Sequence, residues 1–418
     1  MSCPYDRVLS IIHESGIWAS AQHHFIPSGD VLRLTGQQAE EIQKIATASY
    51  RFLRDMAGVA ARAHRGIPYG PGELLDAIFG AGLPRSHKSV CFLRPDEPGP
   101  FLFKIDLMMT PQGLRIAEID GFNRRGAGYS TLAALVRAAL YPDALSFPGV
   151  IPLMATRLRQ RGIERFTLLY ADKERFYLPE FTILARELAQ QGVTMEVIGE
   201  KEFTPSDDRR VFLDFPLLDA NHEAIAYLVK AYADDSVTFL NPPRPFWGSK
   251  NLLGLLWGSP LHVYGFIPSE TGDCLRSFTP PTHILGAPRR TKRRRRTLGK
   301  SGPWQRRLAY DPNSYILKAA MSSGMKGVTF SHDPRFAAGI EKAESGRYTY
   351  VLQEAVEQSP QPLCYFDQGG QECKGDWYVR LTVHVVDGTA ADIIVTARQD
   401  TAVHGATDSL QIGAIIAH

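Results

Sequence analysis

The spacing of apolar residues first predicts a long helix and then a pair of strands. Over residues 35–65 the apolar residues recur at helical spacing, which predicts an amphipathic helix. Residues 101–121 contain two apolar runs joined at Pro111-Gln112-Gly113, and this predicts two strands connected by a turn. A loop of small residues at 126–128 then leads into a helix that contains LAALVRAAL.

Residues 165–250 alternate between strand and helix patterns. Strands are predicted at 165–171, 193–199 and 211–215, and amphipathic helices at 179–192 and 222–235. A further helix is predicted at 251–258. Alternation of this kind is typical of an α/β unit.

The alternation is lost after residue 276, where most apolar runs predict strands. These runs lie at 315–320, 350–356, 377–388 and 391–398, and they predict an α+β region with an antiparallel sheet. A length of 418 residues suggests two or three domains. With boundaries near Pro148 and Pro280, we expect an N-terminal α+β region at 1–148, an α/β domain at 149–275 and a third domain at 276–418.

Composition narrows the class of protein. Apolar residues make up 44% of the chain and charged residues 22%, as expected for a soluble globular protein. No apolar run approaches the roughly 20 residues that span a bilayer, so we expect no membrane partner. The five cysteines are scattered and form no C-x-x-C motif, which argues against disulfides or zinc and predicts a cytoplasmic protein.

Positive charge is concentrated in one segment. Residues 289–307 contain ten Lys and Arg residues and no acidic residue, so subtracting these ten from the net charge of +3 leaves −7 on the remainder. A segment of this composition cannot form a core. Three interpretations remain open: a solvated loop, an anion-attracting rim over a phosphate site, and a nucleic-acid-binding patch.

Lys318 stands at the start of a possible phosphate-binding hairpin. An apolar run ends at this lysine, and the loop that follows contains Ser323, Gly324, Lys326 and Gly327 before an extended segment resumes at 328. Loop amides and a strand lysine can face the same anion. A solvated lysine at a strand edge is the plainer interpretation.

Three further pieces accompany this hairpin in the C-terminal half. Lys250 ends a turn and begins a helix. The strand at 350–358 runs into four residues with candidate nucleotide contacts, Gln353, Glu354, Val356 and Glu357. The last strands carry charged side chains at Arg380, Asp387, Arg398 and Asp400.

The order of these pieces resembles the ATP-grasp superfamily, and within it the glutathionylspermidine-synthetase-like carboxylate–amine ligases. The resemblance covers about residues 100–418 and implies an ATP-grasp fold preceded by a Rossmann-like domain. It implies that Lys250 and Lys318 contact the α- and β-phosphates of ATP. It also implies that Ser323, Gly324, Lys326 and Gly327 cover the phosphates, and that Gln353, Glu354, Val356 and Glu357 meet the adenine and ribose.

The resemblance further implies a γ-phosphate and magnesium site on the last strands. Arg380 and Arg398 are the catalytic candidates, and Asp387, Gln399 and Asp400 are the candidate Mg²⁺ ligands. Gln399 and Thr401 stand where the family has Glu and Asn. Because Mg²⁺ prefers anionic oxygens, either Asp392 or Asp408 supplies charge or the nucleotide site is weakened.

An N-terminal segment resembles the substrate region of such ligases. Residues 105–130 match the two strands that precede a Gly-rich loop in the family. Glu118 and Asp120 are candidates to hold the incoming amine, and Arg124 and Arg125 to bind the substrate carboxylate. The plainer interpretations are surface arginines at 124 and 125, a solvent-facing Arg380 and a purely structural Asp387-Gly388 turn.

The function implied by the resemblance is ATP- and Mg²⁺-dependent ligation of a small-molecule carboxylate to an amine through an acyl phosphate. Two alternatives stay open. One is a non-catalytic relative that binds nucleotide, and the other is a nucleic-acid-binding protein that uses residues 289–307. The sequence identifies neither substrate, because substrate pockets are built from variable loops.

Overall fold

The structure is a computed structural model that describes residues 4–65, 79–80, 88, 90–122, 125–206, 208–258, 267–285, 311, 313–322, 327–345 and 349–417. Its helices are α1 (Pro4–Ser15), α2 (Gly36–His64), α5 (Ala127–Leu140), α6 (Val150–Gln160), α7 (Leu178–Gln190), α8 (His222–Ala233), α9 (Asn251–Gly258), α10 (Ser269–Phe278) and α12 (Phe336–Glu344). Its short 3₁₀ helices are η1 (Ala21–His23), η2 (Asp172–Tyr177) and η3 (Pro245–Gly248).

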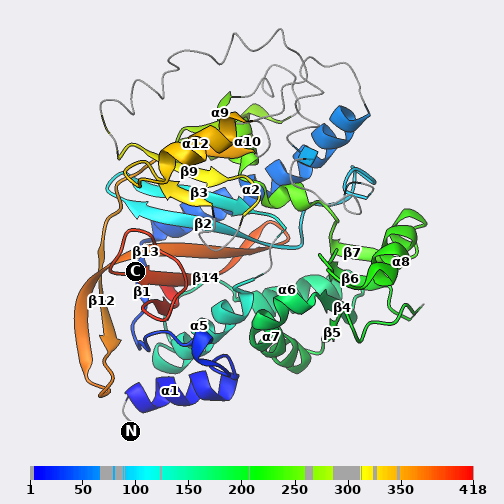
Figure 1. Cartoon of the computed structure of the whole chain (residues 1–418). Helices are drawn as coiled ribbons and strands as arrows, with labels where there is room; N and C mark the ends of the chain where they lie inside the picture. The colour runs from blue at the N-terminus through cyan, green and yellow to red at the C-terminus, as the bar shows by residue number, and fades with distance from the viewer. Residues whose placement is uncertain are drawn as a thin grey trace.

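The strands form four sheets (Figure 1). Those of the first half are β1 (Leu32–Leu34), β2 (Leu102–Thr110), β3 (Gly113–Asp120), β4 (Arg165–Tyr170), β5 (Thr194–Gly199), β6 (Val211–Asp214) and β7 (Thr238–Asn241). Those of the second half are β8 (Thr282–Leu285), β9 (Tyr315–Ala319), β10 (Val328–Phe330), β11 (Tyr350–Glu354), β12 (Gln361–Phe366), β13 (Glu372–Val386), β14 (Thr389–Arg398), β15 (Leu410–Ile412) and β16 (Ala414–Ile416).

The largest sheet has six strands in the order β15-β14-β13-β2-β3, with β12 beside β13. One face of it is apolar and covers α2, whose Phe52 and Met56 share a core with Ile105, Leu107 and Val383. Side chains alternate between the two faces of a strand. The residues between these apolar positions therefore face the opposite side, which is polar.

A four-stranded antiparallel sheet, β10-β9-β11-β8, lies above the six-stranded sheet in Figure 1. Its own core contains Tyr315, Leu317, Phe336 and Leu352. Helix α12 covers β9 and β10, and α9 lies against β8. This sheet carries Lys318 and Gln353, and it brings them to the polar face of the larger sheet.

A parallel sheet, β5-β4-β6-β7, forms an α/β unit with α6, α7 and α8 (Figure 1), and part of its core is shared with Leu102 and Val386 of the six-stranded sheet. Helix α7 reaches the N-terminal end of α5, where Gly128 permits a close approach. A Cβ at Gly128 would lie 2.2 Å from the Cβ of Glu180. The missing side chain is therefore what lets α7 place Glu180 beside the first turn of α5.

The predicted helices and strands are confirmed, but one expectation about the sheets is wrong. Strands after residue 276 do not form a single antiparallel sheet, because β13 pairs with β2 from Arg380↔Met108 to Val386↔Leu102. Strands β13 and β14 therefore belong to the same sheet as the N-terminal hairpin β2–β3, whereas β8–β11 form their own sheet. The division at 148 and 275 stays a prediction.

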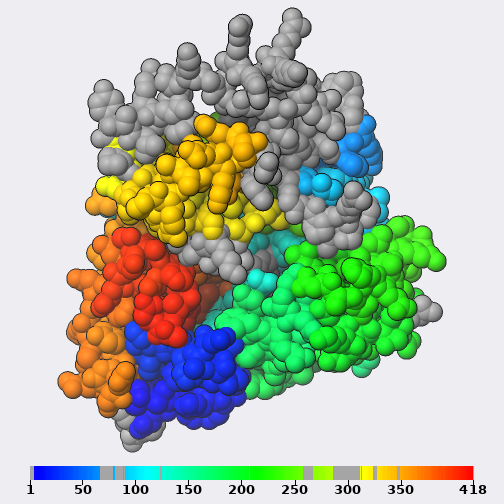
Figure 2. Space-filling view, in the orientation of Figure 1, coloured from blue at the N-terminus to red at the C-terminus, as the bar shows by residue number. Residues whose placement is uncertain are grey.

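Residues 26–34 lie beside the last strands of the described chain. Strand β1 pairs in parallel with β16, and Ile26 bridges to Leu410. In Figure 2 the N-terminal segment (blue) accordingly adjoins the C-terminal segment (red). Among the described helices, none combines the length and the apolar character needed to cross a bilayer.

Candidate functional site

A pocket of about 400 Å³ lies between the six-stranded sheet, the four-stranded sheet and the α/β unit. The surface is hollowed between the C-terminal segment and the teal part of the chain in Figure 2. Its lining includes six of the residues expected from the sequence to form a site, namely Glu118, Asp120, Arg125, Lys250, Lys318 and Arg380.

The floor of the pocket is the polar face of the six-stranded sheet. The register places Asp106 opposite Glu118 on one side and Thr382 on the other, and Lys104 opposite Asp120. Neither Lys104 nor Asp106 was expected from the sequence to belong to a site. The available signal was their alternation with the apolar residues of β2, which places both on one face.

The two lysines expected to contact phosphate meet at one end of the pocket. Lys250 Nζ lies 3.0 Å from a Glu118 carboxylate oxygen and donates to the Ser322 carbonyl at 2.7 Å. Lys318 Nζ donates to the Ala117 carbonyl at 3.1 Å and to Gln353 Oε1 at 2.6 Å. Burial lowers the pKa of Lys318 to about 8, an effect that the nearby Glu118 carboxylate partly opposes.

Arg380 reaches the same pocket from β13. Its guanidinium is 3.8 Å from Asp106, and its two hydrogen bonds, to Val403 and Thr396, are both long at 3.5 Å. Burial would raise the pKa of Asp106, but Arg380 and Lys104 hold it below its usual value. Arg380 is thus a cation whose protein contacts are weak enough to be replaced by a ligand.

The carboxylates beside the lysines differ in their environment. Glu118 is paired with Lys250, whereas burial raises the pKa of Asp120 to about 6. Within the part of the chain that the structure describes, no group of three or more His, Cys, Asp or Glu side chains is arranged to hold a metal ion. The pocket therefore offers carboxylate oxygens without a preformed metal cage.

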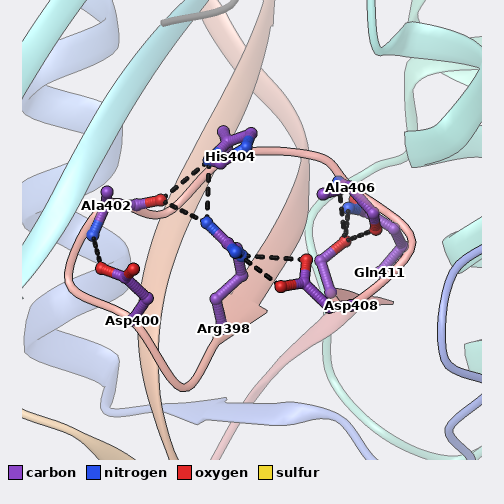
Figure 3. Close-up of polar contacts among 8 residues, drawn as sticks. Arg398, Asp400, Ala402, His404, Ala406, Asp408 and Gln411 are labelled. Carbon is purple, nitrogen blue, oxygen red and sulfur yellow. Dashed lines mark hydrogen bonds and ion pairs between the residues drawn. The ribbon is translucent and has the colours of Figure 1, made fainter.

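Arg398, a second catalytic candidate, does not line the pocket. Figure 3 shows its contacts within the loop that follows β14. Its guanidinium donates to Asp408 at 3.1 Å, to the Ala402 carbonyl at 3.0 Å and lies 3.0 Å from His404 Nδ1. Asp400 accepts from the Ala402 amide at 2.8 Å. Residues 401–406 form one wall of the pocket. Arg398 and Asp400 stabilise this loop through their hydrogen bonds and do not face the interior of the pocket.

The remaining metal candidates lie elsewhere. Asp387 sits in the β13–β14 turn with φ 50°, where its carboxylate accepts from Arg161 at 2.7 Å and from Tyr50 at 3.4 Å. Gln399 is exposed after β14 and does not line the pocket. The structure therefore does not bring Asp387, Gln399 and Asp400 together in the pocket.

Of the residues expected to bind adenine and ribose or to form the phosphate-covering loop, some lie near Lys318 and others do not. Gln353 contacts Lys318 directly, but Glu354, Val356 and Glu357 do not line the pocket. Gly327, with φ +74°, closes the hairpin by accepting from the Ala319 amide at 2.8 Å, and a Cβ there would lie 2.8 Å from Ala319 Cβ. Ser323, Gly324, Lys326, Arg124 and the basic segment 289–307 lie outside the described residues.

The opposite end of the pocket is aromatic and acidic. His23 stacks on Phe176 at 4.1 Å, and its Nδ1 lies 3.0 Å from the Tyr129 hydroxyl. Arg125 donates to Glu174 at 2.8 Å and covers the Tyr177 ring at 4.3 Å. The sequence analysis identified only Arg125 here, because these residues come from separate segments.

Neither a family model nor a curated protein matches the chain. One similar solved structure is a glutathione synthetase-like effector (GSS30) from Globodera pallida in the apo form. It has a TM-score of 0.52 and 12% identity, and the match covers 100% of this chain and 98% of that one.

Two other matches have TM-scores below 0.5. A putative gamma-glutamylcysteine synthetase from Methylobacillus flagellatus KT has a TM-score of 0.41 and 12% identity, with coverage of 92% of this chain and 89% of that one. The D-cycloserine synthetase DcsG has a TM-score of 0.32 and 15% identity, with coverage of 60% and 75%. Only the first match has the similarity needed to compare folds. At 12% identity it shows that the chain shares the fold of this glutathione synthetase-like effector, and it does not show an activity.

Proposed function

We propose that the chain is an ATP-dependent ligase that joins a small-molecule carboxylate to an amine. The observation that supports this most directly is the meeting of Lys250, Lys318 and Arg380 in one pocket, although they come from three separate segments. Phosphoryl transfer depends largely on cations fixed where negative charge develops. A triphosphate in this pocket would meet all three.

The contacts of Lys318 and Arg380 favour exchange for an anionic ligand. The acceptors of Lys318 are a carbonyl and an amide oxygen, both neutral, and those of Arg380 are distant. A phosphate oxygen would supply the opposite charge that Lys318 lacks and would raise its lowered pKa. Nucleotide binding and protonation of Lys318 should therefore be linked.

Glu118 and Asp120 are the carboxylates best placed to hold magnesium with the nucleotide. Both line the pocket beside Lys250 and Lys318, unlike Asp387, Gln399 and Asp400. Mg²⁺ commonly uses one or two protein carboxylates together with substrate phosphates and water, so the absence of a cage among the described residues fits this ion. When bound, the metal would neutralise charge on the phosphates.

The proposed reaction begins when a carboxylate oxygen attacks the γ-phosphorus, which releases ADP and forms an acyl phosphate. The amine then displaces phosphate and forms the amide. Lys250, Lys318 and Arg380 bind and orient the phosphate oxygens, and the wall at 401–406 helps to exclude water. Arg398 supports this wall through Asp408 and Ala402.

A screen for ADP release tests the proposal. Purified protein would be incubated with ATP, Mg²⁺ and pairs drawn from a panel of carboxylates and amines. The expected result is ADP release that requires Mg²⁺ and a particular pair, with a new amide detected by mass spectrometry. Nucleotide binding without turnover for any pair would instead support the non-catalytic relative.

A further inference from the structure

We propose that Glu180 binds the ammonium group of the amine substrate, and that the surrounding aromatic rings receive the apolar body of that amine. The inference deepens the proposed function, on which it rests, by naming the chemical class of one substrate. It starts from a buried carboxylate that the reaction outlined above does not use.

Glu180 is held in place through only one of its two oxygens. The residue is 2% exposed and lies in the first turn of α7. Its Oε2 accepts from the amides of Gly126 and Gly128 at 2.7 and 3.3 Å, at the start of α5. Its Oε1 is buried and has no hydrogen-bond partner among the described residues. A buried carboxylate oxygen left this way is costly, and a ligand donor would remove that cost.

Two cations near Glu180 interact mainly with other carboxylates. Lys104 and Arg125 both lower the pKa of Glu180. Arg125 is nevertheless paired with Glu174, and the carboxylate that most strongly favours the charged form of Lys104 is Asp106. His23 cannot compensate, because burial lowers its pKa and keeps the ring neutral at pH 7. No ion pair of Glu180 occurs within the described ranges of the chain. The direct partner that Glu180 lacks is therefore a cation.

The rings beside Glu180 favour an ammonium group with an apolar body. Tyr129, Phe176, Tyr177 and His23 line the same part of the pocket as Glu180. Aromatic faces attract cations and also cover apolar groups. Burial raises the pKa of Glu180 to about 7, so the carboxylate is largely ionised at pH 8, where a primary alkylamine is still protonated.

A role restricted to capping α5 would use Glu180 differently. Glutamine could accept the same two amide hydrogen bonds without burying a charge, so capping does not require a carboxylate. Binding a ligand cation does require one. The substitution Glu180→Gln therefore separates the two roles while preserving the shape of the side chain.

The test is calorimetric titration at pH 8 without ATP, using 2-phenylethylamine and its neutral analogue 2-phenylethanol. We expect the wild type to bind the amine at least tenfold more tightly than the alcohol. In Glu180→Gln the amine should bind roughly 10- to 100-fold more weakly, the usual effect of losing a charged hydrogen bond. Glu223→Gln is the matched control, because Glu223 is exposed in the first turn of α8.

Phenylalanine distinguishes two sources of the ammonium group. Tighter binding of phenylalanine would identify an amino acid as the amine, and tighter binding of 2-phenylethylamine an amine without a carboxylate; both require Glu180. The inference is overturned if the wild type does not distinguish amine from alcohol, if neither binds, or if Glu180→Gln retains the preference.

A measurement on the wild type covers the case in which Glu180→Gln does not fold. Affinity for 2-phenylethylamine should fall several-fold as the pH drops from 8 to 6, whereas affinity for the alcohol should not. The pKa values of Lys104, Arg125 and Tyr129 are raised, so these groups keep one charge state over this range. The pKa of His23 is lowered by burial, which moves its titration toward the acidic end of the range or below it. Equal pH dependence for the two probes would contradict the inference.

ATP titration of the same samples separates this inference from the proposed function. If the wild type binds ATP but does not prefer the amine, only the role of Glu180 is contradicted. If the wild type does not bind ATP, the ligase proposal is contradicted, whatever the amine probes show.

Discussion

The two ends of the pocket hold opposite charges that burial perturbs in opposite directions. At the lysine end, burial lowers the pKa of Lys318 to about 8, and at the aromatic end it raises the pKa of Glu180 to about 7. In both cases the hydrogen-bond partners are neutral, and neighbouring opposite charges offset the effect of burial only in part. The comparison indicates a pocket built for an anion at one end and a cation at the other.

The largest expected effect comes from removing the cation at the lysine end. Lys318→Met should lower turnover by roughly 10²–10³-fold, because a cation that meets the transferring oxygens is lost. Lys342→Met, an exposed lysine of α12, is the matched control and should leave turnover unchanged. Steady-state ADP release measures both, and full activity in Lys318→Met would remove this lysine from the site.

A second change tests how the lysine end is held together. Glu118→Gln removes the charge that pairs with Lys250, whose side chain is only 4% exposed. Leaving this ammonium unpaired should lower the free energy of unfolding by about 3 kcal/mol. Urea denaturation measures it against Glu223→Gln. An unchanged urea midpoint would show that other groups balance the positive charge of Lys250.

The same kind of substitution at the aromatic end should have the opposite effect on stability. The raised pKa of Glu180 means that its contribution to stability is complete below pH 4.5 and is lost as the pH rises through about 7. Glu180→Gln should therefore be more stable than the wild type at pH 8, by about 1–3 kcal/mol. The difference should shrink at pH 5. If the difference in urea midpoint between Glu180→Gln and the wild type is the same at pH 5 and at pH 8, the buried charge of Glu180 is contradicted.

The smallest expected effect is the pH dependence of nucleotide affinity. With a pKa of about 8, Lys318 loses its proton between pH 8 and 9, and affinity for ATP should fall about fivefold over that interval. Lys318→Arg should flatten the profile, because arginine stays charged. Titrations at several pH values provide the measurement, and a flat wild-type profile would mean that Lys318 does not bind the nucleotide as a cation.

Local pattern was sufficient to predict the elements but not their partners. The apolar spacing of residues 35–65 predicts α2, and the Pro-Gln-Gly turn predicts the β2–β3 hairpin. The pairing of β2 with β13 depends on contacts between distant segments. No local signal in either strand specifies it, so the two-sheet arrangement of the C-terminal half could not be deduced.

The site shows the same limit. Lys250, Lys318 and Glu118 could be named because each stands in a recognisable local context. Arg398 does not line the pocket, because its guanidinium is bound to Asp408 beyond the end of β14, and this contact could not be predicted from the local pattern. Glu180, which lines the pocket, was not expected from the sequence although a signal existed, since it shares the helical face of the buried Ile183 and Leu184. The signal in the sequence was a carboxylate on an otherwise apolar face of the predicted helix.

Calorimetric titration with Mg²⁺–ATP tests the central claim most directly, which is that Lys250 and Lys318 hold the same triphosphate. We predict one binding site per chain in the wild type, at least tenfold weaker binding in Lys250→Met and in Lys318→Met, and no change in Lys342→Met. Folding of each variant would be checked by circular dichroism. Unchanged ATP affinity in both folded pocket variants would contradict the claim.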